Sequence, residues 1–453
     1  MSPLFILFLV ASAVFILLFL VLKLKISAFI SLLITAIYVG ILSGMPLSSI
    51  TKSIQDGMAG TLGFVATVVG LGAIFGQMLE SSGGAQSLAH HLVKKFGNEK
   101  ASWALTLTGF LVAIPIFLDV AFIILVPIVY ALARDTKKSI LYYGIPLLAG
   151  LAVTHSFVPP TPGPVAVADI IKADLGWVIL IGMIMGLPVA ILAGPVFGKY
   201  ISKRINLQPP SEIFVSSENE TKTGGELPSF GLIFSLIGIP LALILLSTVV
   251  SFLSSKQILR NSVFTDIVTF CGHPFSALII ATLIAIYLLG IKRGMSKQHI
   301  LDLSTKALGP AGIIILITGA GGVLKQILVD SGIGKMMAES IAGSSFSPIL
   351  LAWLLAAIVR ITQGSATVAM ITAAGIIAPV LGEFNLSDPG RALIVIAIAS
   401  GATILSHVND SGFWLVSKYL GMNEKQTLQS WTVMETIISV SGLALALITS
   451  LFL

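Results

Sequence analysis

The apolar stretch from 347 to 381 is interrupted by Thr362-Gln363-Gly364-Ser365-Ala366-Thr367, and the stretch from 102 to 132 by Ile114-Pro115-Ile116-Phe117-Leu118-Asp119. A bilayer tolerates irregular backbone only where protein surrounds it or where it lines a watery cavity. Each stretch has about 30 residues, which is long for the roughly 20 that one helical crossing needs. We therefore expect each stretch to form a re-entrant hairpin whose tip is the interruption.

Basic residues flank the first stretch on both sides. They are Lys94, Lys95 and Lys100 before it, and Arg134, Lys137 and Lys138 after it. Because basic loops stay in the cytoplasm, both ends of this hairpin are expected there. The second stretch has few flanking charges and is expected to open to the outside. The same rule, applied along the chain, predicts that both termini lie outside.

The composition indicates a polytopic membrane protein. Of 453 residues, 56% are hydrophobic and 10% are charged, against roughly 25% charged in soluble domains. The net charge of +6 is spread over many loops, so no nucleic-acid partner is expected. The single cysteine, Cys271, excludes a disulfide framework, a zinc ribbon and an iron–sulfur site. No metal or cofactor motif and no HExxH or GxSxG motif occurs, so we expect no cofactor and no enzyme.

Ten further apolar runs are candidates for membrane crossings. They lie near 3–22, 26–43, 61–79, 141–168, 176–198, 230–253, 274–290, 309–328, 391–417 and 430–453.

Short patterns recur at a constant spacing and indicate an internal repeat. Ala36-Ile37-Tyr38, for example, returns 249 residues later as Ala285-Ile286-Tyr287. We therefore expect a first repeat at 1–205, a polar cytoplasmic linker at 206–229 and a second repeat at 230–453. Each repeat holds five crossings, one hairpin and one broken helix. Since five is odd, the repeats must be inverted, as in secondary transporters.

Broken helices at membrane depth expose backbone N–H groups, whose dipoles attract anions. Gly364, Ser365 and Thr367 open such a half-helix in the second repeat, and Thr161 and Gly163 do so in the first. Small residues allow close approach, and the hydroxyls can bond a carboxylate. The alternative is that these interruptions are packing kinks. Four of them, at 115–119, 154–164, 362–367 and 406–412, fall at matching positions of the two repeats, which is more than packing needs. The sequence thus predicts a site for a small organic anion.

Five charged or titratable residues at membrane depth are the candidates for chemistry: Asp119, His155, Arg360, His407 and Asp410. Such groups cost roughly 3 kcal/mol at the centre of a membrane helix, so they usually have a function or a partner. Arg360 keeps its charge and could bind a substrate carboxylate or neutralise a buried Asp. Asp119 and Asp410, ahead of His155 and His407, are the candidates for carrying protons.

Several motifs together resemble those of the gluconate permease family of proton symporters, which also includes D-serine carriers. They are Gly83-Gly84-Ala85-Gln86, Val126-Pro127, Pro159-Pro160-Thr161-Pro162-Gly163-Pro164, Gly194-Pro195-Val196, Gly364-Ser365-Ala366-Thr367-Val368-Ala369 and Ser406-His407-Val408-Asn409-Asp410-Ser411-Gly412-Phe413-Trp414. The resemblance runs almost end to end and extends to a wider ion-transporter superfamily. It implies an elevator-like homodimer in a bacterial inner membrane.

We therefore expect import of gluconate or a related sugar acid by proton symport. The substrate carboxylate would meet Gly364, Ser365 and Thr367, with Thr161, Gly163 and Asn409 on its hydroxyls. A sodium-coupled carboxylate or D-serine carrier is the nearest alternative, because hairpin tips also hold Na⁺. A passive channel and an intramembrane enzyme are the other classes considered.

Overall fold

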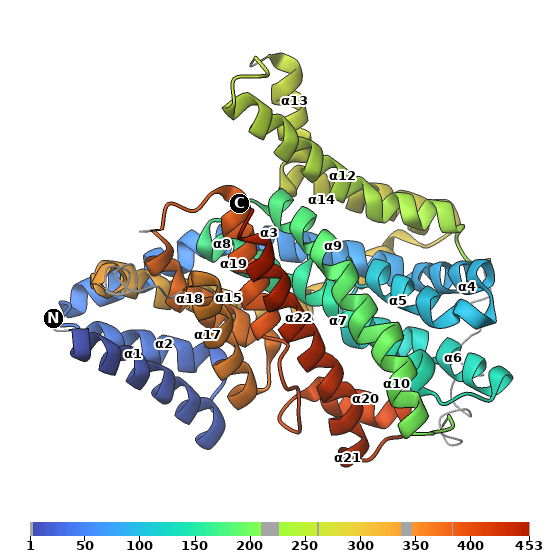
Figure 1. Ribbon diagram of the computed structural model, residues 1–453. Coiled ribbons are helices and arrows are strands. Elements are labelled where there is room, and N and C mark those ends of the chain that lie inside the picture. Colours follow the sequence, from blue (N-terminus) through green and yellow to red (C-terminus); the bar gives the residue numbers. More distant parts are fainter. Residues whose placement is uncertain (1–2, 210–225, 261, 337–346, 383, 453) are drawn as a thin grey trace.

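The computed structural model describes residues 3–209, 226–260, 262–336, 347–382 and 384–452, and these ranges contain helices, turns and no β-strand (Figure 1). The first part of the chain forms α1 (Pro3–Leu18), α2 (Ala28–Leu42), α3 (Leu47–Ser81), α4 (Gly84–Phe96), α5 (Ala101–Val112), α6 (Leu118–Thr136), α7 (Leu141–Phe157), α8 (Pro162–Ile171), α9 (Leu175–Ile191) and α10 (Phe197–Arg204). The second part forms α12 (Phe230–Ser255), α13 (Val263–Gly272), α14 (Pro274–Ala285), α15 (Lys297–Asp330), α17 (Pro348–Gln363), α18 (Ala366–Leu381), α19 (Asp388–Gly401), α20 (Ser411–Leu420), α21 (Glu424–Thr427) and α22 (Val433–Thr449). The prediction of an all-α fold is confirmed. The predicted linker at 206–229 falls mostly outside the described residues.

Seven segments of the described chain are long and apolar enough to cross a membrane, namely Leu47–Ser81, Leu141–Ile171, Leu175–Arg204, Phe230–Ser255, Pro274–Arg293, Lys297–Asp330 and Glu424–Thr449. Each coincides with one of the ten predicted runs. The runs at 3–22 and 26–43 correspond to shorter apolar helices. The run at 391–417 is divided between α19 and α20. The chain is therefore a multi-pass membrane protein.

Two helices are much longer than their predicted apolar runs. α3 has 35 residues and begins at Leu47, while α15 has 34 and begins at Lys297. Their first halves carry charged and hydroxyl residues, which hydropathy alone reads as loop. Both end 249 residues apart, at Ser81 and Asp330, which is the spacing of the sequence repeat.

α3 and α15 pack along each other through small residues. Contacts run from the hydrogen bond of Ser53 with Asp330 (2.5 Å), through Gly57 against Gly322, to Gly70 against Leu308. Residue numbers rise along α3 as they fall along α15, so the helices are antiparallel. A Cβ at position 57 would lie 2.7 Å from the Gly322 carbonyl oxygen. This close approach requires glycine, as membrane helix contacts often do.

All four predicted interruptions are breaks between helices. Residues 113–117 join α5 to α6, and residues 364–365 join α17 to α18. Residues 158–161 separate α7 from α8, and residues 402–410 separate α19 from α20. α17 and α18 contact each other. The polar breaks therefore sit inside a bundle of apolar helices.

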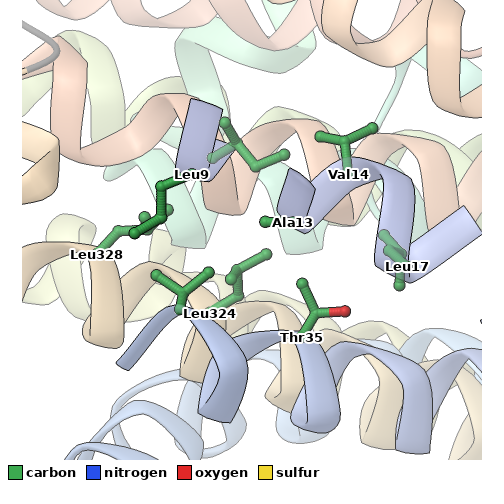
Figure 2. Close-up of a pocket in the computed structure, with 9 residues that line it drawn as sticks. Leu9, Ala13, Val14, Leu17, Thr35, Leu324 and Leu328 are labelled. Atoms are coloured by element: carbon green, nitrogen blue, oxygen red, sulfur yellow. The ribbon is translucent and has the colours of Figure 1, made fainter. Parts of the chain in front are cut away.

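α1 and α2 pack on α15, beside α17 and α18 (Figure 1). Figure 2 shows Leu9, Ala13 and Leu17 of α1 around a narrow gap that Leu324 and Leu328 of α15 close from the other side. The gap measures about 10 Å³, and Thr35 contributes the one polar side chain among its lining residues. It can hold no more than one water and is a packing defect rather than a binding site.

Candidate functional site

A cavity of about 610 Å³ lies where three of the four breaks meet. This volume falls in the range of roughly 300–1,000 Å³ that small-molecule sites occupy. Its polar and charged lining residues are Asp119, His155, Ser156, Arg360, Gln363, Ser365, Thr367, Thr403, Asn409, Asp410, Ser411 and Glu435. They come from α6, α7, α17, α18, α20, α22 and the connections between them. Segments far apart in sequence thus bring their polar groups to one place.

Arg360 is the only arginine or lysine that lines the cavity among the described residues. Its side chain is 4% exposed, and Nη2 lies 2.5 Å from Oδ2 of Asp410. Nη1 donates to the carbonyl oxygen of Gly364. A buried ion pair is tolerated when further hydrogen bonds satisfy its remaining atoms. The pair therefore ties the end of α17 to the start of α20.

Asp410 is held by a network of hydrogen bonds. Oδ2 also accepts from the Ser406 hydroxyl at 2.5 Å, and Oδ1 accepts from the Gly412 N–H at 2.9 Å. The second contact makes Asp410 the N-cap of α20, where a carboxylate also complements the helix dipole. Trp431 donates from Nε1 to the Ser406 hydroxyl at 2.7 Å. Asp410 thus has a positioning role in this conformation.

Gly364 allows the sharp turn between α17 and α18. Its φ is +86°, and a Cβ there would lie 2.3 Å from the Asn409 carbonyl oxygen. For both reasons, any residue other than glycine would strain the backbone at this position. Ser365 follows as the N-cap of α18 and accepts from the Val368 N–H at 3.4 Å. The first turn of α18 thereby starts at the cavity, where its N–H groups favour an anion.

Asn409 fastens the hairpin from the other side. Its Nδ2 donates to the carbonyl oxygens of Ile361 at 2.9 Å and Thr362 at 3.2 Å. These are carbonyls of the last turn of α17, which no helical N–H reaches. Since both amide hydrogens already donate to these carbonyls, a ligand would bond Asn409 through its amide oxygen, as an acceptor.

Three buried polar atoms of the cavity residues have no hydrogen-bond partner within the part of the chain that the structure describes. They are Nε of Arg360, Oε1 of Gln363 and Nδ1 of His155. Buried polar groups in proteins are nearly always paired, so unpaired ones around a cavity mark places where a ligand can bond. Together they offer a donor, an acceptor and an imidazole nitrogen, which suits a substrate that has both a carboxylate and hydroxyls.

The structure places eight of the predicted site residues at the cavity, namely Asp119, His155, Arg360, Gly364, Ser365, Thr367, Asn409 and Asp410. It places the other three elsewhere. The Thr161 hydroxyl donates to the Val158 carbonyl at 2.7 Å, and Gly163 packs toward the sulfur of Met370. His407 lies 2.8 Å, through Nε2, from the Ile361 carbonyl oxygen. These three are engaged with the protein itself.

Sequence reasoning missed Glu435, which lines the cavity with only 4% of its surface exposed. The signal was present, because Glu435 is the one acidic residue in the predicted run at 430–453. Gln363, Thr403 and Trp431 were also missed. Gln363 lies within the predicted interruption at 362–367, whereas nothing local to Thr403 or Trp431 indicates a cavity.

Comparison with known proteins identifies the family. The profile of the GntP family permeases matches residues 4–452. The chain belongs to the GntP family. It is 43% identical to the gluconate permease of Pseudomonas aeruginosa over 96% of this chain and 95% of that one. It is 42% identical to the low-affinity gluconate transporter of Escherichia coli K12, with 96% of each chain covered. The L-idonate transporter of the same strain is 39% identical over 96% of this chain and 97% of its own.

The fold of this GntP family member is similar to that of a solved transporter. The crystal structure of the YdaH transporter of Alcanivorax borkumensis superposes with a TM-score of 0.61 at 12% identity, covering 88% of each chain. At that identity the likeness concerns the fold alone. The expectation that the chain resembles the gluconate permeases is confirmed.

Proposed function

We propose that this GntP family permease imports gluconate or a related sugar acid together with protons. The observation that carries the proposal is the cavity between helix breaks, where a buried arginine and the first turn of α18 offer positive potential to an anion. Its relatives are named for gluconate and L-idonate. Both are sugar acids, with one carboxylate and several hydroxyls.

In this proposal the substrate carboxylate binds Arg360 and the start of α18, at Gly364, Ser365 and Thr367. The geometry supports that assignment, because Nε of Arg360 is buried and free of partners in the described chain. The Asn409 amide oxygen would accept from a substrate hydroxyl.

We propose Thr161 and Gly163 as substrate contacts of the first half in another state of the transport cycle, where they add little to the affinity of the state described here. Both lie outside the cavity in this conformation, so contact with substrate requires a different conformation of a transport cycle.

Charge balance supports proton coupling. The carboxylates of Asp119, Asp410 and Glu435 line the cavity against one guanidinium, and a sugar acid would add another negative charge. Like charges this close repel strongly where the effective dielectric constant is low. Protons taken up with the substrate would relieve that repulsion. Asp119 and His155 are the proposed proton carriers of the first half. Asp410 and His407 are the proposed carriers of the second half, where Asp410 pairs with Arg360 and His407 lies against the Ile361 carbonyl oxygen.

The proposed mechanism is alternating access by inverted repeats. The antiparallel packing of α3 and α15, which share the repeat spacing, supports the inversion. α17 and α18 have 16 residues each, or about 24 Å of helix, which is short of the roughly 30 Å hydrocarbon core. This supports a re-entrant hairpin there, and we propose the same for α5 and α6. We further propose a homodimer in the bacterial inner membrane with both termini outside.

The test is uptake of labelled gluconate by purified protein in proteoliposomes. An acidic outside and sodium-free buffers should drive accumulation that a protonophore abolishes. Accumulation driven only by a sodium gradient would instead support a sodium-coupled carrier. Equilibration without accumulation under either gradient would support a passive channel. A thermal-shift panel of sugar acids, D-serine and glycerate would rank the substrates, since a bound ligand raises apparent stability.

A further inference from the structure

Glu435 is a buried carboxylate that lines the cavity. It lies in the first turn of α22 and is 4% exposed. Its side chain makes no hydrogen bond with any residue in the described ranges, although it lines the cavity beside Thr403 and Trp431. The residues before it, Leu428–Thr432, form a π-helical turn. Such turns are frequent at functional sites.

The start of α22 is fixed in place by its neighbours. The Thr432 hydroxyl donates to the Ser406 carbonyl oxygen, and Gly442 packs against the Ser400 hydroxyl. α22 therefore meets the carboxyl end of α19, where the break before α20 begins. A carboxylate on this turn is held at one position relative to the ion pair of Arg360 and Asp410.

The charged groups around Glu435 in the described chain compensate its negative charge only in part. Arg360 on α17 and Asp410 before α20 interact with it electrostatically, while His155 on α7 and Asp119 on α6 face the same cavity. α9, which also packs on α22, has no charged residue, and the charged residues of α19, Asp388 and Arg391, lie in its first turn at the opposite end.

The guanidinium of Arg360 already has two partners. Arg360 donates to Gly364 and pairs with Asp410, so Glu435 has no cation of its own among the described residues. An ionised carboxylate buried without a partner costs several kcal/mol. A proton from the aqueous side of the cavity would remove that charge. An incoming sugar-acid carboxylate needs the same region, because it must approach Arg360.

We propose that Glu435 carries the proton that admits the substrate. The proton binds a carboxylate oxygen of Glu435 from the open side, the substrate then binds Arg360, and the proton leaves to the opposite side after the substrate has left. Once ionised, Glu435 repels the substrate carboxylate. This inference rests on the proposed proton symport and assigns one residue of that symport.

The test compares Glu435→Gln, which keeps the shape of the protonated side chain, with Glu424→Gln, an exposed glutamate on α21. Gluconate affinity and transport are measured in the full-length protein from pH 5.5 to 8.5. For wild type and Glu424→Gln, affinity should fall by up to about tenfold per pH unit once the carrier group ionises. For Glu435→Gln, affinity should vary less than about twofold over the range.

Transport assays separate a proton carrier from a structural residue. Glu435→Gln should retain counterflow exchange of gluconate, which needs no net proton movement, and should lose proton-driven accumulation by at least about tenfold. Glu435→Asp, which keeps a titratable group, should retain pH-dependent affinity. The inference is overturned if Glu435→Gln accumulates gluconate with the wild-type pH profile. It is also overturned if counterflow is lost in both Glu435→Gln and Glu435→Asp, because Glu435 then has a structural role.

Failure of the proposed symport gives a different result. In that case wild-type protein itself shows no accumulation under a pH gradient, whatever Glu435→Gln does. Wild-type accumulation together with an unchanged Glu435→Gln variant leaves the symport intact and removes only Glu435.

Discussion

The break between α7 and α8 and the break between α19 and α20 correspond in the chain but differ in their surroundings. α8 and α20 have 10 residues each, and they begin at Pro162 and Ser411, 249 residues apart. Residues 158–161 of the first break are all buried. The second break runs from 402 to 410 and directs Asn409 and Asp410 toward the cavity.

The difference shows how a repeat can supply fold and chemistry separately. In the first break the Thr161 hydroxyl bonds the Val158 carbonyl, and a Cβ on Gly72 would only touch Pro160. Its polar groups are thus satisfied locally. In the second half, Nε of Arg360 and Oε1 of Gln363 belong to cavity residues and have no hydrogen-bond partner in the described chain, while the corresponding atom of the first half is Nδ1 of His155, which precedes the break. We expect mutations to be far more damaging to substrate binding in the second half than in the first.

The largest effect is expected at Arg360. Arg360→Lys removes the fork that reaches both Gly364 and Asp410, because an ammonium is a single point charge. Loss of one hydrogen bond to a charged group costs about 1.5–3 kcal/mol, so gluconate affinity should fall at least about tenfold. Arg391→Lys is the control, since Arg391, in the first turn of α19, donates to the Ile171 carbonyl at the end of α8, away from the cavity. Equal affinity in the two variants would contradict the assignment.

The next comparison uses two glycines. Gly364→Ala places a Cβ 2.3 Å from the Asn409 carbonyl oxygen at a φ of +86°, and the left-handed backbone alone costs about 1–2 kcal/mol. We expect a lower unfolding temperature and loss of gluconate binding. Gly163→Ala meets the movable Met370 sulfur at 2.7 Å and should cost about 1 kcal/mol, the low end for an inserted methyl group. Thermal unfolding with and without gluconate measures both. A more severe Gly163 phenotype would reverse the ranking of the halves.

Asp119 is the residue of the first half that is expected to matter for coupling. Its side chain faces the cavity and makes no hydrogen bond within the described chain, so Asp119→Asn should preserve counterflow. Proton-driven accumulation should fall by about tenfold and lose its pH dependence. Asp135→Asn, at the exposed far end of the same helix, should behave as wild type. Retained proton-driven accumulation with unchanged pH dependence in Asp119→Asn would remove Asp119 from the proton pathway.

The positions of the breaks could be predicted from sequence because their signals are local. Gly364 and Pro115 interrupt apolar runs, and the chain does break beside each of them. The use of each break could not be predicted in this way. Thr161 and Thr367 both lie at the start of a half-helix, close to small residues. Packing against distant segments decides which of the two hydroxyls reaches the cavity. Glu435 was missed for the same reason, since the charged residues that share its cavity are 25 or more residues away in the sequence.

The smallest expected effect separates these two threonines. Thr367→Val removes a hydroxyl from the cavity, and a hydrogen bond contributes about 0.5–1.5 kcal/mol net, so gluconate affinity should fall about three- to tenfold. Thr161→Val removes a bond to the Val158 carbonyl instead. It should lower stability by about 1 kcal/mol and change affinity less than about twofold. Isothermal titration with thermal unfolding distinguishes the two. If Thr161→Val weakens binding as much as Thr367→Val, then the first-half break meets the substrate in another conformation, and the asymmetry described here belongs to one state of the cycle rather than to the site.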